Sequence, residues 1–250
     1  MSSAVVLAAA AQPPVIPNYG GPPGGEQGCI ARNGTFCWDW VKGHWGDILQ
    51  PRLLEHLELT VIAVGIGFAI AFAAALFAHR KGWFEAPFST FSAFLYTIPS
   101  LALFQLLVPF TGLTMVTIEI GLIGYTLLIL FRNILEGLRG VPADVLEAAR
   151  GMGLTRRQIL MRIEIPLAFP AISAGVRIAV VTTISLATVA AYITPLGLGQ
   201  PIFYGLATDF TTEFVATAAL AIALAIAADG LLVLTQRMLT PWARARRRAA

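Results

Sequence analysis

A short set of charged and small residues interrupts an otherwise apolar sequence and has the residue types of a protein-docking site. The set begins with Glu147-Ala148-Ala149, continues with Gly153 and ends with Ile163-Glu164-Ile165-Pro166. Adjacent alanines allow another chain to approach the backbone closely, and the glutamate beside them supplies a charge. These residues favour a docking helix, although an amphipathic surface loop of a membrane protein would have a similar composition.

Local signals within 141–165 predict a helix, a bend and a second helix. Pro142 suits the first position of a helix, where its missing N–H has no intrahelical partner. Gly153 favours the left-handed turn that often ends a helix. Thr155 and Gln158 fit a capping box, which begins a new helix. We therefore expect this segment to project as a compact helical element.

The rest of the chain must position this segment, and its composition indicates a membrane protein. Hydrophobic residues make up 57% of the sequence and charged residues 12%, whereas soluble domains contain about 25% charged residues. Runs of roughly 20 apolar residues are long enough to cross a bilayer as helices. We predict an all-α membrane protein with about five transmembrane helices, at 57–78, 88–110, 113–131, about 166–193 and about 213–234. Pro99 is expected to kink the second of these helices.

The distribution of basic residues predicts the orientation of these spans. Arginine and lysine gather at His79-Arg80-Lys81, in the segment 132–162 and in the tail 244–248, whereas the connections near Gly112 and at 194–211 contain neither. Because cytoplasmic loops are enriched in basic residues, we expect a multi-pass protein of the plasma membrane with its N-terminus outside and its C-terminus inside. A basic tail beside a span is typical of a topology anchor, and it gives no reason to predict nucleic-acid binding.

The sequence divides into an N-terminal leader at 1–50, a membrane domain at 51–238 and a basic cytoplasmic tail at 239–250. The leader is rich in proline and glycine, and part of it is expected to be disordered. Cys29 and Cys37 follow this stretch. Outside the cell they could form a disulfide, or they could remain free thiols in a mobile tail.

Two charged residues fall inside predicted spans. Arg177 lies in the fourth and Asp229 in the fifth, at depths that make an ion pair between them geometrically reasonable. Charges at such depth are rare and are usually functional or paired. We expect a structural brace here, with direct contact to substrate as the alternative.

Four polar side chains lie at helical spacing on the fourth span: Thr182, Ser185, Thr188 and Tyr192. A stripe of hydroxyls could line a translocation path, or it could hydrogen-bond a neighbouring helix. The three histidines have no spacing typical of metal ligands, and no pairing of a nucleophile with a base is visible. We therefore predict no metal site and no enzymatic chemistry.

The quoted motif resembles the cytoplasmic signature of permease subunits of binding-protein-dependent ABC importers, with Ile165 where that family usually has leucine. Further segments are similar to the permeases for glycine betaine, carnitine, choline and related osmoprotectants. They are Tyr96-Thr97-Ile98-Pro99-Ser100-Leu101-Ala102-Leu103-Phe104, Arg132-Asn133, Gly151-Met152-Gly153-Leu154-Thr155 and Gly175-Val176-Arg177. The resemblance covers roughly residues 50–238. One departure is the loop 194–199, which is more glycine-rich in relatives.

The resemblance implies a fold like that of type I ABC importer permeases, with a cytoplasmic coupling helix. Separate ATPase subunits would bind this helix through Glu147, Ala148, Ala149, Gly153 and Leu154. ATP would be bound by those subunits and no cofactor by this chain, which has no Gly-rich phosphate-binding loop. An extracytoplasmic binding protein would deliver the solute, and a second copy or a related permease would complete the membrane unit within the lipid.

An osmoprotectant such as glycine betaine, carnitine or choline is the substrate that the resemblance implies. A permease for another small solute is one alternative. A second alternative is an ATP-independent channel or secondary carrier that uses Arg177 and Asp229 for ion coupling.

Overall fold

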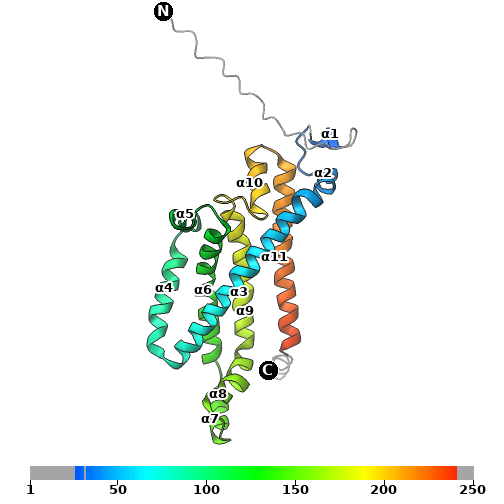
Figure 1. The fold of residues 1–250 in the computed structure, drawn as a ribbon. Helices are drawn as coiled ribbons and strands as arrows, with labels where there is room; N and C mark the ends of the chain where they lie inside the picture. The colour runs from blue at the N-terminus through cyan, green and yellow to red at the C-terminus, as the bar shows by residue number, and fades with distance from the viewer. Residues whose placement is uncertain (1–25, 31, 241–250) are drawn as a thin grey trace, which may run out of the picture.

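The structure is a computed structural model in which residues 26–30 and 32–240 are described. Within these residues every regular element is a helix, and the long helices run side by side (Figure 1). The predicted all-α membrane class is confirmed. Four described helices are long and apolar enough to cross a membrane, and the number rises to five if one bent pair forms a single span.

The four long helices correspond to the first, third, fourth and fifth predicted spans. They are α3 (Gln50–Arg80), α6 (Met115–Arg139), α9 (Ile165–Ala190) and α11 (Thr211–Leu239). The shortest has 25 residues and is therefore about 37 Å long, which exceeds the hydrocarbon thickness of a bilayer. Gly112, in the connection just before α6, has φ +73°, in the left-handed region that favours glycine.

The second predicted span is broken rather than kinked. It consists of α4 (Glu85–Thr97) and α5 (Ser100–Thr111), whose axes differ by 100°. Pro99 cannot donate a helical hydrogen bond, and its ring disfavours a helical conformation at the residue before it. Ile98 accordingly has an extended backbone, with φ −67° and ψ 129°. The expectation of one kinked helix was therefore wrong at this position.

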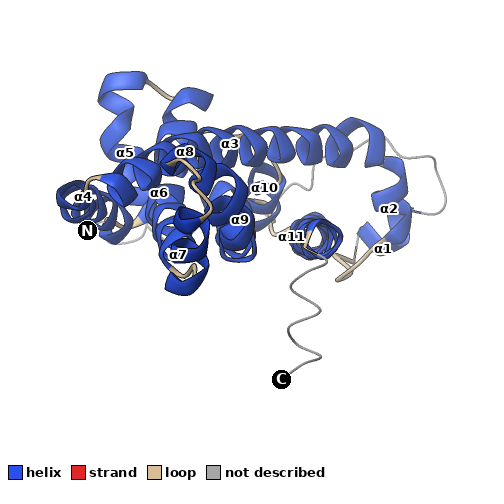
Figure 2. Ribbon diagram, turned by 90° about the horizontal axis from the view of Figure 1, so that it is seen from below, coloured by secondary structure: helices blue, strands red, loops and turns tan. Residues whose placement is uncertain are grey.

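The core lies where α3 and α9 pack along α6. In the view from below (Figure 2), α4, α6, α9 and α11 follow one another across the molecule, and α3 runs along one side of them. Buried side chains of α3, α6 and α9 form one apolar cluster, which includes Ala71, Phe131, Ile134 and Ile172. Of the four long helices, α11 is the least buried and leaves most of its apolar surface uncovered.

Helices α6 and α9 approach each other closely at Gly175. A Cβ atom added to this glycine would lie 2.5 Å from the Cβ atom of Asn133, which is closer than two such atoms can pack. The side chain of Asn133 is itself held by a hydrogen bond from its Nδ2 to the carbonyl oxygen of Ile129, 2.8 Å away. Two motifs distant in sequence, Arg132-Asn133 and Gly175-Val176-Arg177, therefore meet at one helix crossing.

Substituting Gly175→Ala is expected to destabilise the protein by about 1–3 kcal/mol, because the added methyl group overpacks the crossing. This cost should outweigh the higher helix propensity of alanine, which is worth about 1 kcal/mol. Thermal unfolding in detergent measures the change. Gly230→Ala on α11 is the matched control, since a Cβ atom added there would meet nothing within 4 Å. An unchanged melting temperature for Gly175→Ala would contradict this account of the crossing.

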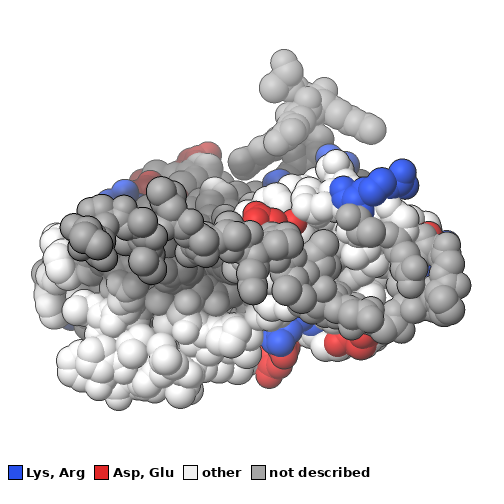
Figure 3. Space-filling model, turned by 90° about the horizontal axis from the view of Figure 1, so that it is seen from above, with Lys and Arg blue, Asp and Glu red and all other residues white. Residues whose placement is uncertain are grey.

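Shorter elements gather at the two ends of the long helices (Figure 1). At one end, called the α7 end, lie α7 (Ala143–Gly151), α8 (Arg156–Ile159), η3 (Leu160–Glu164) and η2 (Gly82–Phe84). At the other, called the α10 end, lie α1 (Glu26–Ile30), α2 (Trp38–Gly43), η1 (Trp45–Leu49), α5 and α10 (Gly199–Ala207). Seen from the α10 end, the described surface is mostly uncharged, with scattered acidic and basic groups (Figure 3).

The base of α9 has an irregular backbone. The π-helical turn η3 joins α8 directly to α9, so helical structure continues from Arg156 to Ala190. Pro166 follows at the start of α9, and Pro170 lies one turn further on. Each proline removes one backbone hydrogen bond from the helix. The side-chain amide of Gln236 on α11 donates to the carbonyl oxygen of Pro170 at 3.5 Å.

Candidate coupling surface and transport path

The predicted docking segment forms a helix, a bend and a second helix beyond the α7 end of the long helices (Figure 1). Pro142 lies just before α7 as its N-cap residue. Gly153 has φ +80°, which is the left-handed conformation expected of it, and its N–H donates to the carbonyl oxygen of Arg150. The capping box between Thr155 and Gln158 is present at the start of α8, as predicted.

The five predicted docking residues differ in exposure. Glu147, Ala148 and Gly153 are exposed, Leu154 is half-buried and Ala149 is fully buried. Ala149 therefore anchors α7 to the protein, and the backbone N–H of Leu154 donates to its carbonyl oxygen at 3.2 Å. The surface available to another protein includes Glu147, Ala148, Gly153 and the neighbouring Met152, which is 71% exposed.

Two side-chain contacts hold the connections at the α7 end, and sequence reasoning did not predict either of them. The Nε2 atom of His79 lies 3.3 Å from Oε2 of Glu164, which connects the end of α3 to η3. Arg139 makes a two-pronged contact with Glu85, which connects the end of α6 to the start of α4. Glu164 belongs to the quoted motif, but its partner lies 85 positions earlier in the chain, and no local pattern reveals such a pairing.

Arg177 and Asp229 form the ion pair proposed for them. Arg177 Nε lies 2.8 Å from Asp229 Oδ1, and Arg177 Nη2 lies 2.9 Å from Asp229 Oδ2. The two parallel contacts join the middle of α9 to α11. This geometry is the bidentate arrangement of guanidinium and carboxylate, which is both strong and directional.

The four polar residues predicted for a translocation path lie on α9 and in the turn after it. Ser185 and Tyr192 are exposed, and Thr182 and Thr188 are half-buried. The Thr188 hydroxyl donates to the carbonyl oxygen of Ser185 at 2.6 Å, so it is engaged within its own helix. The ring of Tyr192 contacts that of Phe203 on α10, with 5.7 Å between centroids. Their role in a path stays a prediction.

A bracket of hydrogen bonds holds the loop after α9 at the α10 end. His56 on α3 is fully buried; its Nδ1 accepts from the N–H of Leu198, and its Nε2 donates to the carbonyl oxygen of Ile184. The N–H of Gly197, a residue with φ +61°, donates to Glu55 Oε2 at 3.0 Å. Sequence reasoning missed this role for His56, because its partners lie more than 120 positions away.

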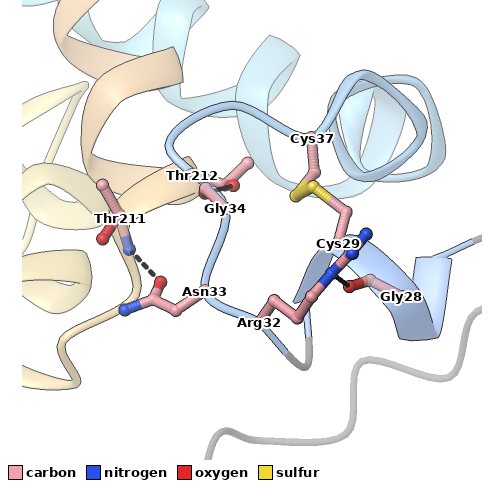
Figure 4. The surroundings of a disulfide bond; sticks show 8 residues. All are labelled: Gly28, Cys29, Arg32, Asn33, Gly34, Cys37, Thr211 and Thr212. Carbon is pink, nitrogen blue, oxygen red and sulfur yellow. Dashed lines mark hydrogen bonds between the residues drawn. A yellow bond between two sulfur atoms is a disulfide. The ribbon is translucent and has the colours of Figure 1, made fainter.

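The described residues before α3 fold back and pack on the start of α11. Cys29 and Cys37 form a disulfide that closes a small loop (Figure 4). Asn33 in this loop accepts from the N–H of Thr211 at 2.9 Å and donates to the carbonyl oxygen of Asp209. We call this loop, together with α2 and η1, the N-terminal cap.

Aromatic packing completes the attachment of the N-terminal cap. Trp40 is fully buried and meets the ring of Phe210 edge to face, with 5.3 Å between centroids. The described part of the predicted leader is therefore structured, and η1 continues directly into α3. The remainder of the predicted leader, residues 1–25 and 31, lies outside the described residues, as does most of the predicted tail, 241–250.

Replacing both Cys29 and Cys37 by serine is expected to loosen the N-terminal cap. A loop closed across a separation of 8 residues contributes about 2–3 kcal/mol through the lost freedom of the open chain. Hydrogen exchange of the amides near Asn33 and Thr211 should accelerate, while the amides of α6 serve as an internal control. Equal protection in the variant and the parent protein would show that the cap holds without the disulfide.

Comparisons with known proteins give a consistent result. Residues 63–244 match the model of a family described as binding-protein-dependent transport system inner membrane component. The chain is 35% identical over 205 residues to the glycine betaine/carnitine/choline transport system permease protein OpuCB of Bacillus subtilis, covering 81% of this chain and 93% of that one. It is also 35% identical over 198 residues to the osmoprotectant import permease protein OsmW of Salmonella typhimurium, covering 77% and 92%.

The fold is also similar to a solved structure. A chain of the MetNI methionine ABC transporter, in an inward-facing conformation, superposes with a TM-score of 0.68 at 20% sequence identity. The match covers 80% of this chain and 98% of that one. At this level of identity, the similarity supports the arrangement of helices described above.

Proposed function

Because the chain belongs to the family of binding-protein-dependent transport system inner membrane components, we propose that it forms the translocation path of an ATP-driven importer for small quaternary ammonium compounds. Members of this family are multi-pass proteins of the inner membrane, and the chain is a transport subunit without catalytic activity of its own. The proposal adds the energy source, the class of solute and the orientation.

The proposal that ATP hydrolysis by a separate subunit drives transport is based on the exposed surface of α7. It presents a carboxylate and a small side chain, at Glu147 and Ala148, on a helix that projects from the membrane bundle. An ATPase subunit bound there would supply ATP hydrolysis, and the permease would respond mechanically. The capping box of α8 and the buried Ala149 give this surface a defined shape, which a docking partner requires.

The class of solute rests on the relatives. The substrates named for OpuCB, which are glycine betaine, carnitine and choline, all carry a trimethylammonium group. The family description implies a separate binding protein that delivers the solute. Selection among related solutes would then depend largely on that partner.

The proposed orientation places the α10 end outside the cell and the α7 end in the cytoplasm. The basic residues near Arg80, Arg139 and Arg157 then lie on the cytoplasmic side. A disulfide in the N-terminal cap is consistent with this orientation, because disulfides persist in oxidising compartments.

A second copy of this chain or a related permease would complete the path. Large apolar side chains on α11 are exposed along most of its length, and they suit contact with lipid or with such a partner. They are Ile222, Ile226, Leu231, Leu234, Met238 and Leu239.

Uptake of radiolabelled choline into proteoliposomes tests the proposal. Vesicles containing the permease, its ATPase and the binding protein should accumulate choline only when ATP is supplied on the ATPase side. Vesicles that lack the ATPase are the control. Uptake that continues without ATP or without the ATPase would identify a channel or secondary carrier and overturn the proposal.

A further inference from the structure

A small polar cavity lies at the α10 end, between η1, the start of α3, α10 and the start of α11. Its volume is about 300 Å³, at the lower limit of ordinary ligand pockets. The lining residues are Asp47, Ile48, Arg52, Gln200, Tyr204 and Glu213. Charged and amide side chains therefore predominate in a chain that is otherwise strongly apolar.

Glu213 is the most unusual of these residues. It is only 3% exposed, and its Oε2 atom is buried without a hydrogen-bond partner among the described residues. A buried carboxylate without a partner loses its hydration, which is costly. As the third residue of α11, Glu213 gains partial compensation from the positive end of the helix dipole. That dipole stabilises a carboxylate without occupying both of its oxygens.

The positive charge in the cavity is already engaged. Nη1 of Arg52 lies 2.8 Å from Oε2 of Glu55 and 3.1 Å from the carbonyl oxygen of Pro195, which belongs to the loop held by the His56 bracket. Glu55 lies outside the lining and neutralises Arg52. The lining therefore holds two acidic side chains, Asp47 and Glu213, and no second basic side chain, which suits a cation.

The remaining lining groups restrict the kind of cation. Tyr204 contributes an aromatic side chain to the lining, and aromatic rings attract alkylated ammonium groups that cannot donate hydrogen bonds. Gln200 offers an amide to a hydroxyl or carboxylate at the other end of a short molecule. A bare metal ion would require more oxygen ligands, and no group of three metal-binding side chains occurs among the described residues.

We propose that this cavity is a binding site for a small quaternary ammonium cation, in which the Glu213 carboxylate supplies the charge and the Tyr204 ring the contact surface. The site rests on the proposed function for its biological ligand, since it would receive the solute at the outer mouth of the path. Arg52, which lines the cavity, donates a hydrogen bond to the carbonyl oxygen of Pro195. Binding of a cation in the cavity would therefore be coupled to the position of the loop that contains Pro195.

Equilibrium binding of tetramethylammonium and of choline to the full chain in lipid nanodiscs, without the binding protein, tests the site. The parent protein should show saturable binding. Glu213→Gln should weaken it by about 10–100-fold, because the substitution removes the charge and keeps the shape. Tyr204→Leu should weaken binding by about tenfold, whereas Tyr204→Phe should retain it.

Asp209→Asn is the matched control. Asp209 is exposed, lies at the same end of the molecule outside the cavity lining, and has φ +54°, which asparagine tolerates. Its substitution should leave binding unchanged. Glu213→Asp restores the charge, and it should recover part of the affinity if the Gln variant is folded. Size-exclusion profiles establish that each variant is folded.

The outcomes separate this site from the proposed function. If ATP-driven choline uptake is normal while Glu213→Gln binds and transports like the parent protein, the site is overturned and the function stands. If the parent protein binds tetramethylammonium in a Glu213-dependent way but transports no quaternary ammonium compound, the site stands and the proposed substrate class is overturned. If Asp209→Asn weakens cation binding as much as Glu213→Gln does, the loss of affinity reflects the general surface charge, and the proposed site is overturned.

Discussion

Replacing Glu147 by arginine is expected to abolish association with the ATPase subunits and, with it, ATP-driven uptake. Glu147 is exposed on α7, and among the described residues it makes no ion pair or hydrogen bond. Its removal should therefore leave the fold intact. Reversing a central interface charge beside the exposed Ala148 should weaken binding by about 100-fold or more. Co-purification and titration of the permease in detergent with its ATPase measure this loss.

A charge reversal elsewhere at the α7 end is the control for this result. Glu136 is an exposed carboxylate near the end of α6, outside the α7 surface, and Glu136→Arg should retain association. If both variants bind equally well, the α7 surface is not the docking site. Such a result would mean that the ATPase binds a surface other than the exposed face of α7.

Removing either charge of the Arg177–Asp229 pair is expected to remove most of the folded protein from the membrane. Each substitution leaves one charge within a span without its partner, and a lone charge in that environment is strongly disfavoured. Arg177→Ala and Asp229→Ala should therefore each lower the yield of monodisperse protein severely. Fluorescence-detected size-exclusion chromatography of detergent extracts measures the yield.

The exchanged pair distinguishes a brace from two independent charges. Arg177→Asp combined with Asp229→Arg restores opposite charges across α9 and α11, and it should recover much of the yield lost by the single changes. A yield as low as that of the single variants would contradict a simple brace. If the exchanged protein folds but no longer transports, the position of the arginine itself matters for the solute.

The coupling segment was predictable because its signals are local. Gly153 specifies a left-handed residue and Thr155 with Gln158 specifies a helix start, and both are observed. The spans were likewise predictable from the length of their apolar runs. The ion pair of Arg177 was inferred from depth alone, because few groups in a membrane span can satisfy a charge.

The features that were not predicted depend on distant contacts or on the choice between two local outcomes. Pro99 permits either a kink or a complete break, and only the packing of α4 and α5 on α6 selects the break of 100°. The partners of His56 and Asn33 lie more than 120 residues away in the sequence. No role was predicted for Glu213, because a single acidic residue near the start of a helix is common.

The irregular backbone at the base of α9 has a mechanical consequence. The continuous helix from Arg156 to Ala190 has 35 residues and is about 52 Å long. It is therefore longer than a bilayer is thick, and its two ends lie near opposite faces of the membrane. We expect its stiffness to be lowest at 160–170, because a π-turn and two prolines interrupt the regular hydrogen bonds there. We expect a force on α7 to bend or twist the segment 160–170 first. The regular part of α9 beyond it would then rotate as a rigid body and move the loop at Gly197.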